Sequence, residues 1–323
     1  MKRGRDEIVF LDAGTVNYGD LSWESLRKLG SLKIFPRTSK SQILSRIRGA
    51  HIVITNKCVF DRRTLSKAKA LECICLSATG TNNVDLDAAR ERGIAVANVS
   101  GYSTDSVVQW TFAFILALAG DLKKLDQVAH SGAWSRSFYF TWAPNEIIEV
   151  KGKTLGIVGY GAIGRGVARI ARSIGMKVLI ARIPERRYSA REGRKRVNFL
   201  SVMRRADIVS VHTPLTPFTR DLIDQSVLRR MKRGAFLINM ARGGIVNEKA
   251  LYRALKSGHL RGAATDVLTQ EPPPRNHILL KAPHLLMTPH IAWASREARK
   301  RLLEEIALNV GAFQKGKRRN RVD

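Results

Sequence analysis

Three ionisable residues in the second half of the chain, Arg242, Glu271 and His290, each lie shortly after an apolar run typical of a buried strand. A histidine can give a proton to a developing oxyanion, and a carboxylate at its other ring nitrogen can fix its tautomer. A guanidinium group can hold a carboxylate through two parallel hydrogen bonds. Taken singly, these residues could also be a core histidine, a solvated loop carboxylate and a surface arginine, so the surrounding pattern has to decide.

The stretch Leu155–Gly164 supplies such a pattern, because it is typical of a strand that ends in a glycine-rich turn and opens a helix. Gly159 permits the tight turn, Gly161 lets the backbone approach a diphosphate, and Gly164 lets the helix pack closely on the strand. Amides at the helix start and the helix dipole both favour an anion there. We therefore expect a bound dinucleotide, the alternative being a glycine turn in an α/β protein that binds none.

The elements that would position these residues alternate short apolar strands with amphipathic segments, as in parallel βα units. In the first hundred residues five strands are expected, at Ile8–Asp12, Leu32–Phe35, His51–Thr55, Cys73–Ser77 and Ala95–Asn98. In the second half six are expected, at Thr154–Val158, Lys177–Ala181, Ile208–His212, Ala235–Asn239, Ala263–Asp266 and Leu285–Thr288. The predicted fold class is α/β with two domains, a Rossmann-type doubly wound parallel sheet and a smaller flavodoxin-like substrate domain.

A long apolar helix is expected between the two sets of strands, at Thr104–His130, and an amphipathic helix near the end, at Ser295–Gln314. Residues 1–100 and 293–323 are assigned to a discontinuous substrate domain. Residues 101–292, which include the bridging helix, are assigned to the dinucleotide-binding domain.

With the glycine turn, the loops around Arg242, Glu271 and His290 resemble the D-2-hydroxyacid dehydrogenase family in sequence and in order. Two more stretches support the resemblance, since Ala78–Asp85 is similar to the family's substrate loop and His212–Thr216 to its adenosine-side loop. The resemblance covers nearly the whole chain. It implies NAD(P)H-dependent reduction of a 2-oxo acid to a D-2-hydroxy acid, with hydride from the nicotinamide and a proton from His290.

The resemblance also implies roles for individual residues. Glu271 would orient His290 and favour its protonated form, while Arg242 would hold the substrate carboxylate and polarise the carbonyl group. The backbone amides of Thr79 and Gly80 would complete the clamp on that carboxylate. The expected cofactor-binding residues are Thr104, Gly159, Gly161, Ala162, Ile163, Gly164, Arg182, His212, Pro214, Ala241 and Asp266, of which the last could also be merely structural.

The residue that indicates which dinucleotide binds is Arg182, at the end of the second predicted strand of the Rossmann sheet. NAD-selective proteins carry an acidic residue at about this point, which binds the ribose hydroxyls and repels a 2′-phosphate. Here Arg182, Arg186 and Arg187 stand in its place. We predict NADP(H) as the preferred cofactor and NAD(H) as a second one, the alternative being that Arg182 is one more arginine in a basic chain.

The stretches Val9–Thr15 and Ile291–Ser295 are similar to the glycerate dehydrogenase or hydroxypyruvate reductase branch of the family. No bulky apolar specificity pocket is evident, so hydroxypyruvate or glyoxylate is the expected substrate. Two alternatives stay open. One is reduction of a 2-oxo acid with a second anionic group, such as a phosphonate. The other is a non-enzymatic, dinucleotide-sensing binding protein similar to the C-terminal-binding corepressors.

Composition limits the partners. Lys and Arg total 56 against 27 acidic residues, a formal net charge of +29 that attracts anionic molecules. The charges are spread out and lack interleaved aromatic residues, so nucleic acid is expected to bind only nonspecifically. The longest apolar run, Phe112–Ala119, is too short to span a bilayer, so no membrane partner is expected.

The three cysteines form neither a disulfide framework nor a zinc-site spacing, and no signal peptide is visible, which predicts a cytoplasmic protein without a metal. The aromatic segment Trp134–Trp142 lacks a clear period and is typical of an exposed arm. Such an arm is unfavourable in a monomer, so a homodimer is expected.

Overall fold

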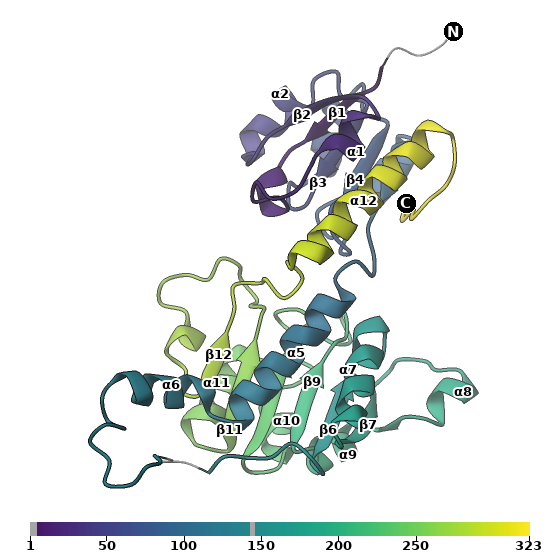
Figure 1. The fold of residues 1–323 in the computed structure, drawn as a ribbon. Coiled ribbons are helices and arrows are strands. Elements are labelled where there is room, and N and C mark those ends of the chain that lie inside the picture. Colours follow the sequence, from purple (N-terminus) through teal and green to yellow (C-terminus); the bar gives the residue numbers. More distant parts are fainter. Residues whose placement is uncertain (1–4, 143–145) are drawn as a thin grey trace. The chain divides into compact units, whose positions relative to one another are not determined.

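The computed structural model describes residues 5–142 and 146–323. It divides the chain into unit 1, Met1–Ser103 with Trp293–Asp323, and unit 2, Thr104–Ala292. Each unit is a parallel sheet with helices on both faces (Figure 1). The predicted fold class, α/β with two Rossmann-like parallel sheets, is therefore confirmed.

Unit 1 is built on a five-stranded parallel sheet. Its strands are β1 (Glu7–Phe10), β2 (Ser31–Ile34), β3 (Ile52–Thr55), β4 (Cys73–Leu76) and β5 (Ala95–Ala97). Their order, β2-β1-β3-β4-β5, is the flavodoxin-like order. The helices are η1 (Ala13–Thr15), α1 (Glu24–Arg27), η2 (Lys40–Gln42), α2 (Ile43–Arg46), α3 (Arg62–Lys67), α4 (Leu86–Glu91) and α12 (Arg296–Gln314).

The core of unit 1 has two layers because apolar residues alternate along the strands. Ile8 and Phe10 of β1 pack with α1 and α12, whereas Val9 and Leu11 pack on the opposite face with α2, α3 and α4. The last residues of the chain extend the free edge of this sheet. Arg321 forms an antiparallel bridge with Ala97, and the guanidinium of Arg321 is itself paired with the Asp323 carboxylate.

Unit 2 is built on a seven-stranded parallel sheet. Its strands are β6 (Thr154–Val158), β7 (Lys177–Arg182), β8 (Val197–Asn198), β9 (Ile208–Val211), β10 (Ala235–Asn239), β11 (Leu260–Thr265) and β12 (Leu285–Met287). The order β12-β11-β10-β9-β6-β7-β8 is the doubly wound Rossmann order, with the reversal between β6 and β9. The helices are α5 (Thr104–Ala119), α6 (Leu122–His130), α7 (Ala162–Ser173), α8 (Ala190–Gly193), α9 (Phe199–Arg205), α10 (Gln225–Arg230), α11 (Glu248–Lys256) and η3 (Ile278–Lys281).

Two expectations for unit 2 were wrong in detail. The sheet has a seventh strand, β8, whose two residues pair with the end of β7 and are too few to show a periodic pattern. The helix expected at Thr104–His130 is two helices, α5 and α6, bent by 61°. The break lies at Gly120 and Asp121, where Asp121 has a left-handed φ of 49°.

The sheet of unit 2 is apolar on both faces. Leu155 and Ile157 of β6 pack with α5 and α7, whereas Val209 and Val211 of β9 pack on the other face with α9, α10 and α11. Within the described residues no single helix is long and apolar enough to cross a membrane, and only the bent pair α5 and α6 together reaches that length and composition.

Candidate functional site

The loops that follow β10, β11 and β12 hold the three ionisable residues singled out in the sequence. Arg242 follows β10, Glu271 follows β11 and His290 follows β12. These strands are consecutive neighbours in a parallel sheet, so their carboxyl ends lie along the same edge. Residues far apart in the sequence are thereby placed on adjacent loops of unit 2.

The His290 ring and the Glu271 carboxylate form a direct pair. His290 Nδ1 lies 2.5 Å from Glu271 Oε2, and the other carboxylate oxygen accepts the Leu268 amide at 2.8 Å. The two side chains are 26% and 32% exposed, so the pair is reachable from solvent. With Nδ1 facing the carboxylate, Nε2 on the opposite side of the ring is the candidate proton donor.

Asp266, at the end of β11, holds the segment that contains His290. The Asp266 carboxylate accepts hydrogen bonds from Thr288 Oγ1 at 2.6 Å, from the Ile291 amide at 2.8 Å and from the Ala292 amide at 3.0 Å. Burial raises the pKa of Asp266, and these hydrogen bonds offset part of the rise. The His290 backbone, at a left-handed φ of 56°, is thus fixed from both sides.

Arg242 lies in a turn that Asn239 shapes. Asn239 Nδ2 donates to the Arg242 carbonyl at 3.0 Å, and Asn239 Oδ1 accepts the Ala241 amide at 3.1 Å. The exposed guanidinium donates from Nη1 to the Ala241 carbonyl at 2.8 Å and forms no ion pair with any residue that the structure describes. Because a guanidinium has five donors, most of them remain for an anionic ligand.

The glycine turn lies at the point where the strand order reverses. A Cβ atom at Gly159 would lie 2.5 Å from the carbonyl carbon of His212, and one at Gly164 would lie 2.1 Å from the carbonyl oxygen of Gly159. A Cβ at Gly161 would meet nothing within 4 Å. Two glycines are therefore required by packing, whereas Gly161 borders open space at the start of α7, beside Ala162 and Ile163.

His212, which follows β9, is a neutral histidine. Burial lowers the pKa of His212 to about 3, and its Nε2 lies 2.8 Å from Ser210 Oγ. Within the described residues its buried Nδ1 has no hydrogen-bond partner. In the same connection, between β9 and α10, Thr219 Oγ1 donates to the Pro214 carbonyl at 2.7 Å. Thr104, another expected cofactor residue, is the first residue of α5.

Arg182, at the end of β7, borders a basic cavity of about 340 Å³. Three guanidinium groups surround the Tyr188 ring, those of Arg196, Arg186 and Arg182, at 4.4, 5.3 and 5.9 Å from its centre. The Tyr188 hydroxyl accepts the Ile183 amide at 3.0 Å, which ties the ring to the end of β7. The cavity is lined by Arg182, Ile183, Pro184, Glu185, Arg186, Tyr188, Asn198 and Phe199.

Thr79 and Gly80 belong to unit 1, whereas the other expected site residues belong to unit 2. Thr79 Oγ1 donates to the Val99 carbonyl at 2.9 Å, and the Thr79 carbonyl accepts Asn98 Nδ2 at 2.7 Å. These bonds fix the loop after β4. Among the described residues the backbone amides of Thr79 and Gly80 have no acceptor, so both can bind an anion.

Sequence reasoning missed two polar side chains that hold the site, Asn239 and Thr288. Each lies at a strand end close to a predicted site residue, which was the available signal. No group of three or more His, Cys, Asp or Glu suited to a metal ion occurs in the part of the chain that the structure describes.

Comparison with known proteins places this geometry in a family context. A family model described as "D-isomer specific 2-hydroxyacid dehydrogenase, NAD binding domain" matches residues 112–292. A Haemophilus influenzae protein whose name assigns it to the 2-hydroxyacid dehydrogenases is 44% identical over 86% of this chain and 89% of that protein. A hydroxypyruvate reductase of Blautia hydrogenotrophica is 36% identical over 96% and 97% of the two chains. A glyoxylate reductase of Korarchaeum cryptofilum is 37% identical over 86% and 84%.

Two solved structures with bound nicotinamide cofactors have the same fold. An acyclic imino acid reductase in complex with NADPH and D-Arg has a TM-score of 0.86 at 26% identity, covering 98% of this chain and 100% of that one. An Aquifex aeolicus D-lactate dehydrogenase with NAD and lactic acid has a TM-score of 0.79 at 28% identity, covering 96% of each chain.

Proposed function

The chain belongs to the D-isomer specific 2-hydroxyacid dehydrogenase family and is an NAD(P)-dependent oxidoreductase that reduces a 2-oxo acid to a D-2-hydroxy acid; we propose that the acid is hydroxypyruvate or glyoxylate. The observation that supports the chemical step best is the 2.5 Å contact between His290 Nδ1 and the Glu271 carboxylate. Relatives named hydroxypyruvate reductase and glyoxylate reductase support the choice of substrate.

In the proposed step the carbonyl oxygen of the substrate gains a proton while the carbonyl carbon gains a hydride. His290 gives that proton from Nε2, and the Glu271 carboxylate stabilises the imidazolium through Nδ1. The remaining acceptor of Glu271 is occupied by the Leu268 amide, which keeps the carboxylate directed at the ring. These two contacts support the proposed proton transfer from His290.

Arg242 is proposed to bind the substrate carboxylate and polarise the carbonyl group. Its guanidinium is exposed and has no carboxylate partner among the described residues, so an incoming anion meets no competing ion pair. The backbone amides of Thr79 and Gly80 are proposed to complete the clamp. Neither amide donates to another described group, which leaves both available for an anion.

The residues of unit 2 fit a nicotinamide dinucleotide. The open space at Gly161 lies beside the first turn of α7, where backbone amides and the helix dipole favour a diphosphate. When bound, the nicotinamide supplies the hydride for the carbonyl carbon. Asp266 and Ala241 are proposed to line its pocket, Thr104 and His212 to border it, and Pro214 to contact the adenosine side.

We also propose that NADP(H) is preferred and that NAD(H) is a second cofactor. The cavity beside Arg182 has two lining arginines against a single carboxylate, Glu185, and β7 does not end in an acidic residue. A charge-assisted hydrogen bond to a 2′-phosphate contributes about 1.5–3 kcal/mol, which corresponds to roughly a 10- to 150-fold difference in affinity.

The test of cofactor choice is steady-state kinetics with NADPH and NADH. Arg182→Asp should lower the ratio of kcat/KM for NADPH to that for NADH by about 10- to 150-fold. Arg191→Asp is the matched control, because Arg191 is an exposed arginine of α8 that does not line the cavity. Equal or better kcat/KM with NADH for the wild-type protein would refute the preference.

The test of the reaction is a panel of 2-oxo acids, namely hydroxypyruvate, glyoxylate, pyruvate and a phosphonate-bearing acid, assayed with both cofactors. His290→Asn should lower kcat by about 10²- to 10⁴-fold, the usual contribution of a positioned general acid. His284→Asn is the control, since His284 is exposed and has a similar left-handed φ of 54°. Negligible turnover of every acid, or wild-type kcat in His290→Asn, would contradict the proposal.

A cytoplasmic homodimer is the proposed form of the protein. Phe138 and Phe140 of the aromatic arm are 95% and 92% exposed, a surface that a second copy would cover. Free, buried cysteines are compatible with a reducing compartment. Light scattering coupled to size exclusion tests the dimer, and a monomeric mass at micromolar concentration would refute it.

A further inference from the structure

The start of α11 contains a partly buried carboxylate that the proposed reaction does not use. Glu248 is the first residue of α11, and its side chain is only 18% exposed. Its Oε1 accepts the Thr269 amide at 2.7 Å, and its Oε2 lies 3.1 Å from Nε2 of His277, whose side chain is 11% exposed. Burying a carboxylate is unfavourable unless it is fully hydrogen-bonded, and here both oxygens have partners.

The segment that Glu248 holds is the one that presents Glu271. The Leu268 amide donates to Glu271 Oε1 at 2.8 Å, and the Thr269 amide next to it donates to Glu248. One backbone stretch therefore supplies adjacent amides to two carboxylates, of which one faces His290 and the other faces His277. A shift of the Thr269 amide would move the Leu268 amide as well, because the two flank a single residue.

Gly243 also contacts the Leu268–Thr269 peptide. A Cβ atom at Gly243 would lie 2.0 Å from the Leu268 carbonyl carbon and 2.3 Å from the Thr269 nitrogen, so the two backbones are in direct contact. The Leu268–Thr269 peptide thus contacts both the Gly243 backbone and the Glu248 carboxylate. Since Gly243 directly follows Arg242, the contact also joins the loops of two proposed catalytic residues.

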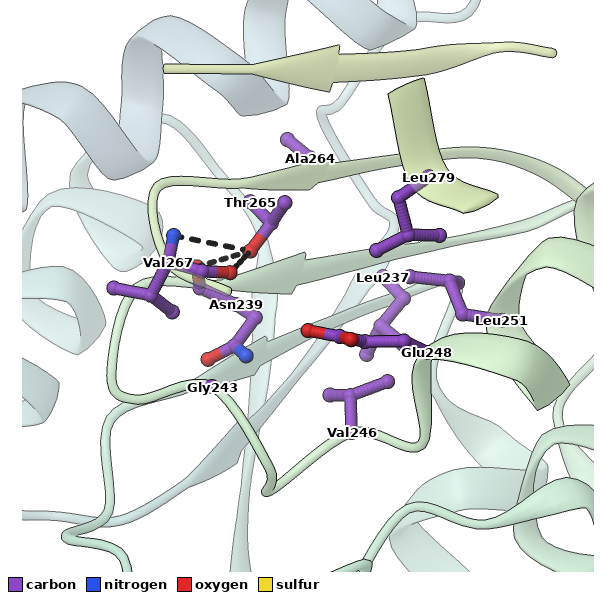
Figure 2. A pocket seen from close by; sticks show the side chains of 10 residues that line it. All are labelled: Leu237, Asn239, Gly243, Val246, Glu248, Leu251, Ala264, Thr265, Val267 and Leu279. Atoms are coloured by element: carbon purple, nitrogen blue, oxygen red, sulfur yellow. Dashed lines mark hydrogen bonds between the residues drawn. The ribbon is translucent and has the colours of Figure 1, made fainter. Parts of the chain in front are cut away.

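The space beside the Glu248 carboxylate is small. Figure 2 shows the Glu248 carboxylate directed from the start of α11 into a small pocket, on the side where Asn239 lies. The cavity is about 10 Å³, which is no larger than a single water requires. The partners of the two carboxylate oxygens are groups of the protein itself, the Thr269 amide and the His277 ring.

His277 fixes the second oxygen of Glu248. Its Nδ1 accepts the Leu279 amide at 3.4 Å, so Nε2 bears the proton in the neutral ring and donates to Glu248 Oε2. His277 precedes η3, which packs against α11. The Glu248 carboxylate is consequently held in one rotamer, with Oε1 aimed at Thr269.

We propose that Glu248 is a positioning residue, which sets the Asp266–Glu271 loop so that the Glu271 carboxylate meets His290. The proposal rests on the proposed function, because it assigns Glu248 an effect on the step in which His290 gives its proton. Glu248 touches neither substrate nor cofactor in this role. It acts through the Leu268–Thr269 peptide and Glu271.

Two conservative substitutions distinguish the effect of the side chain's length from the effect of its charge. Glu248→Gln keeps the length of the side chain and an oxygen that accepts the Thr269 amide. It removes the charge and also the hydrogen bond from His277, because the amide nitrogen of Gln and Nε2 of His277 are both donors. Glu248→Asp keeps a negative charge at the helix start but is one methylene too short to reach that amide. A positioning role predicts that Glu248→Gln retains kcat within about threefold, whereas Glu248→Asp loses about 10- to 100-fold, as misplacement by about 1 Å does.

A merely electrostatic role at the start of the helix predicts the reverse order, because it needs the charge and not the length. The KM for the cofactor should change less than kcat in both variants, because the glycine turn that is proposed to bind the diphosphate follows β6, two strands from β10 in the sheet order. The matched control is Glu304→Asp, at a half-exposed glutamate on α12, which should match the wild type.

Hydrogen exchange of the peptide that covers residues 266–271 gives a readout that needs no turnover. Exchange should rise in Glu248→Asp and stay near wild type in Glu248→Gln. If the wild-type protein reduced no 2-oxo acid, the proposed function would fail while the exchange data still tested the loop. Wild-type kcat with wild-type exchange in Glu248→Asp, or an equal loss of kcat in both variants, would overturn the positioning role.

Discussion

Gly161 offers the sharpest test of where the cofactor binds, because it is the glycine of the turn that protein packing does not require. It is the N-cap of α7, with φ −82° and ψ −156°, and a Cβ atom there would meet nothing within 4 Å. Gly161→Ala therefore introduces no clash and no left-handed strain. Its cost to stability is that of alanine at an N-cap, about 1 kcal/mol or less.

The added methyl group would occupy the space through which a diphosphate approaches the first turn of α7. Losing one charge-assisted hydrogen bond to the phosphate weakens binding by about 1.5–3 kcal/mol, so the Kd for NADPH should rise roughly 10- to 150-fold. Isothermal titration of wild type and variant with NADPH measures this ratio. A thermal melt without cofactor establishes that both proteins are folded.

Two further alanine substitutions make the result specific. Gly164→Ala places a Cβ 2.1 Å from the Gly159 carbonyl oxygen, so it should lower the melting temperature itself. Gly311→Ala, in α12, has only an ordinary 3.6 Å contact with Leu29, so it should leave the Kd unchanged and stabilise the protein by about 0.5–1 kcal/mol. An unchanged Kd for NADPH in a folded Gly161→Ala protein would refute the placement of the diphosphate.

Two more predictions follow from buried titratable groups. His212 has a folded-state pKa of about 3, below its ordinary 6.5, so the unfolded chain binds a proton first and stability falls as pH drops from 6.5 toward 3. The free energy of unfolding should fall by about 2 kcal/mol between pH 7.5 and 5. Urea titrations at the two pH values should show a smaller fall in His212→Asn than in the wild type. An equal fall in the two proteins would contradict this account. Burial raises the pKa of Cys58 to about 11, and Cys73 and Cys75 are buried too. Ellman's reagent at pH 8 should therefore react with no thiol of the folded protein and with all three thiols after denaturation. Rapid labelling of the folded protein would contradict the burial of Cys58.

The strands of both sheets could be predicted closely, because buried parallel strands are short apolar runs bounded by turn residues. The observed ends differ from the expected ones by at most three residues, as at β11, which begins at Leu260 rather than Ala263. The two-residue β8 could not be predicted, since its pairing with β7 depends on the fold around it. The break between α5 and α6 has a local cause at Gly120, but the apolar pattern continues across it.

Some residues of the candidate site could likewise be predicted from the sequence, and others could not. Arg242, Glu271 and His290 could be selected because each follows a recognisable strand, and the 2.5 Å pair between the last two was an expectation that the geometry supports. Glu248 could not be selected, because its partners Thr269 and His277 are more than twenty residues away in the sequence with no motif to connect them. Contacts between residues so far apart in the sequence can be identified only in the folded structure, where the loops pack together.

The order of the strands indicates how the cofactor lies along the proposed site. Along the carboxyl edge from β7 to β12 the loops present Arg182, then the glycine turn after β6, then His212, Arg242, Glu271 and His290. An extended dinucleotide whose diphosphate lies at Gly161 has its adenosine ribose toward β7, where the arginines are, and its nicotinamide toward β10 to β12. The glycine turn therefore locates only the middle of the cofactor. Residues on one side of it are expected to decide which dinucleotide binds, and residues on the other side to decide how fast the carbonyl is reduced.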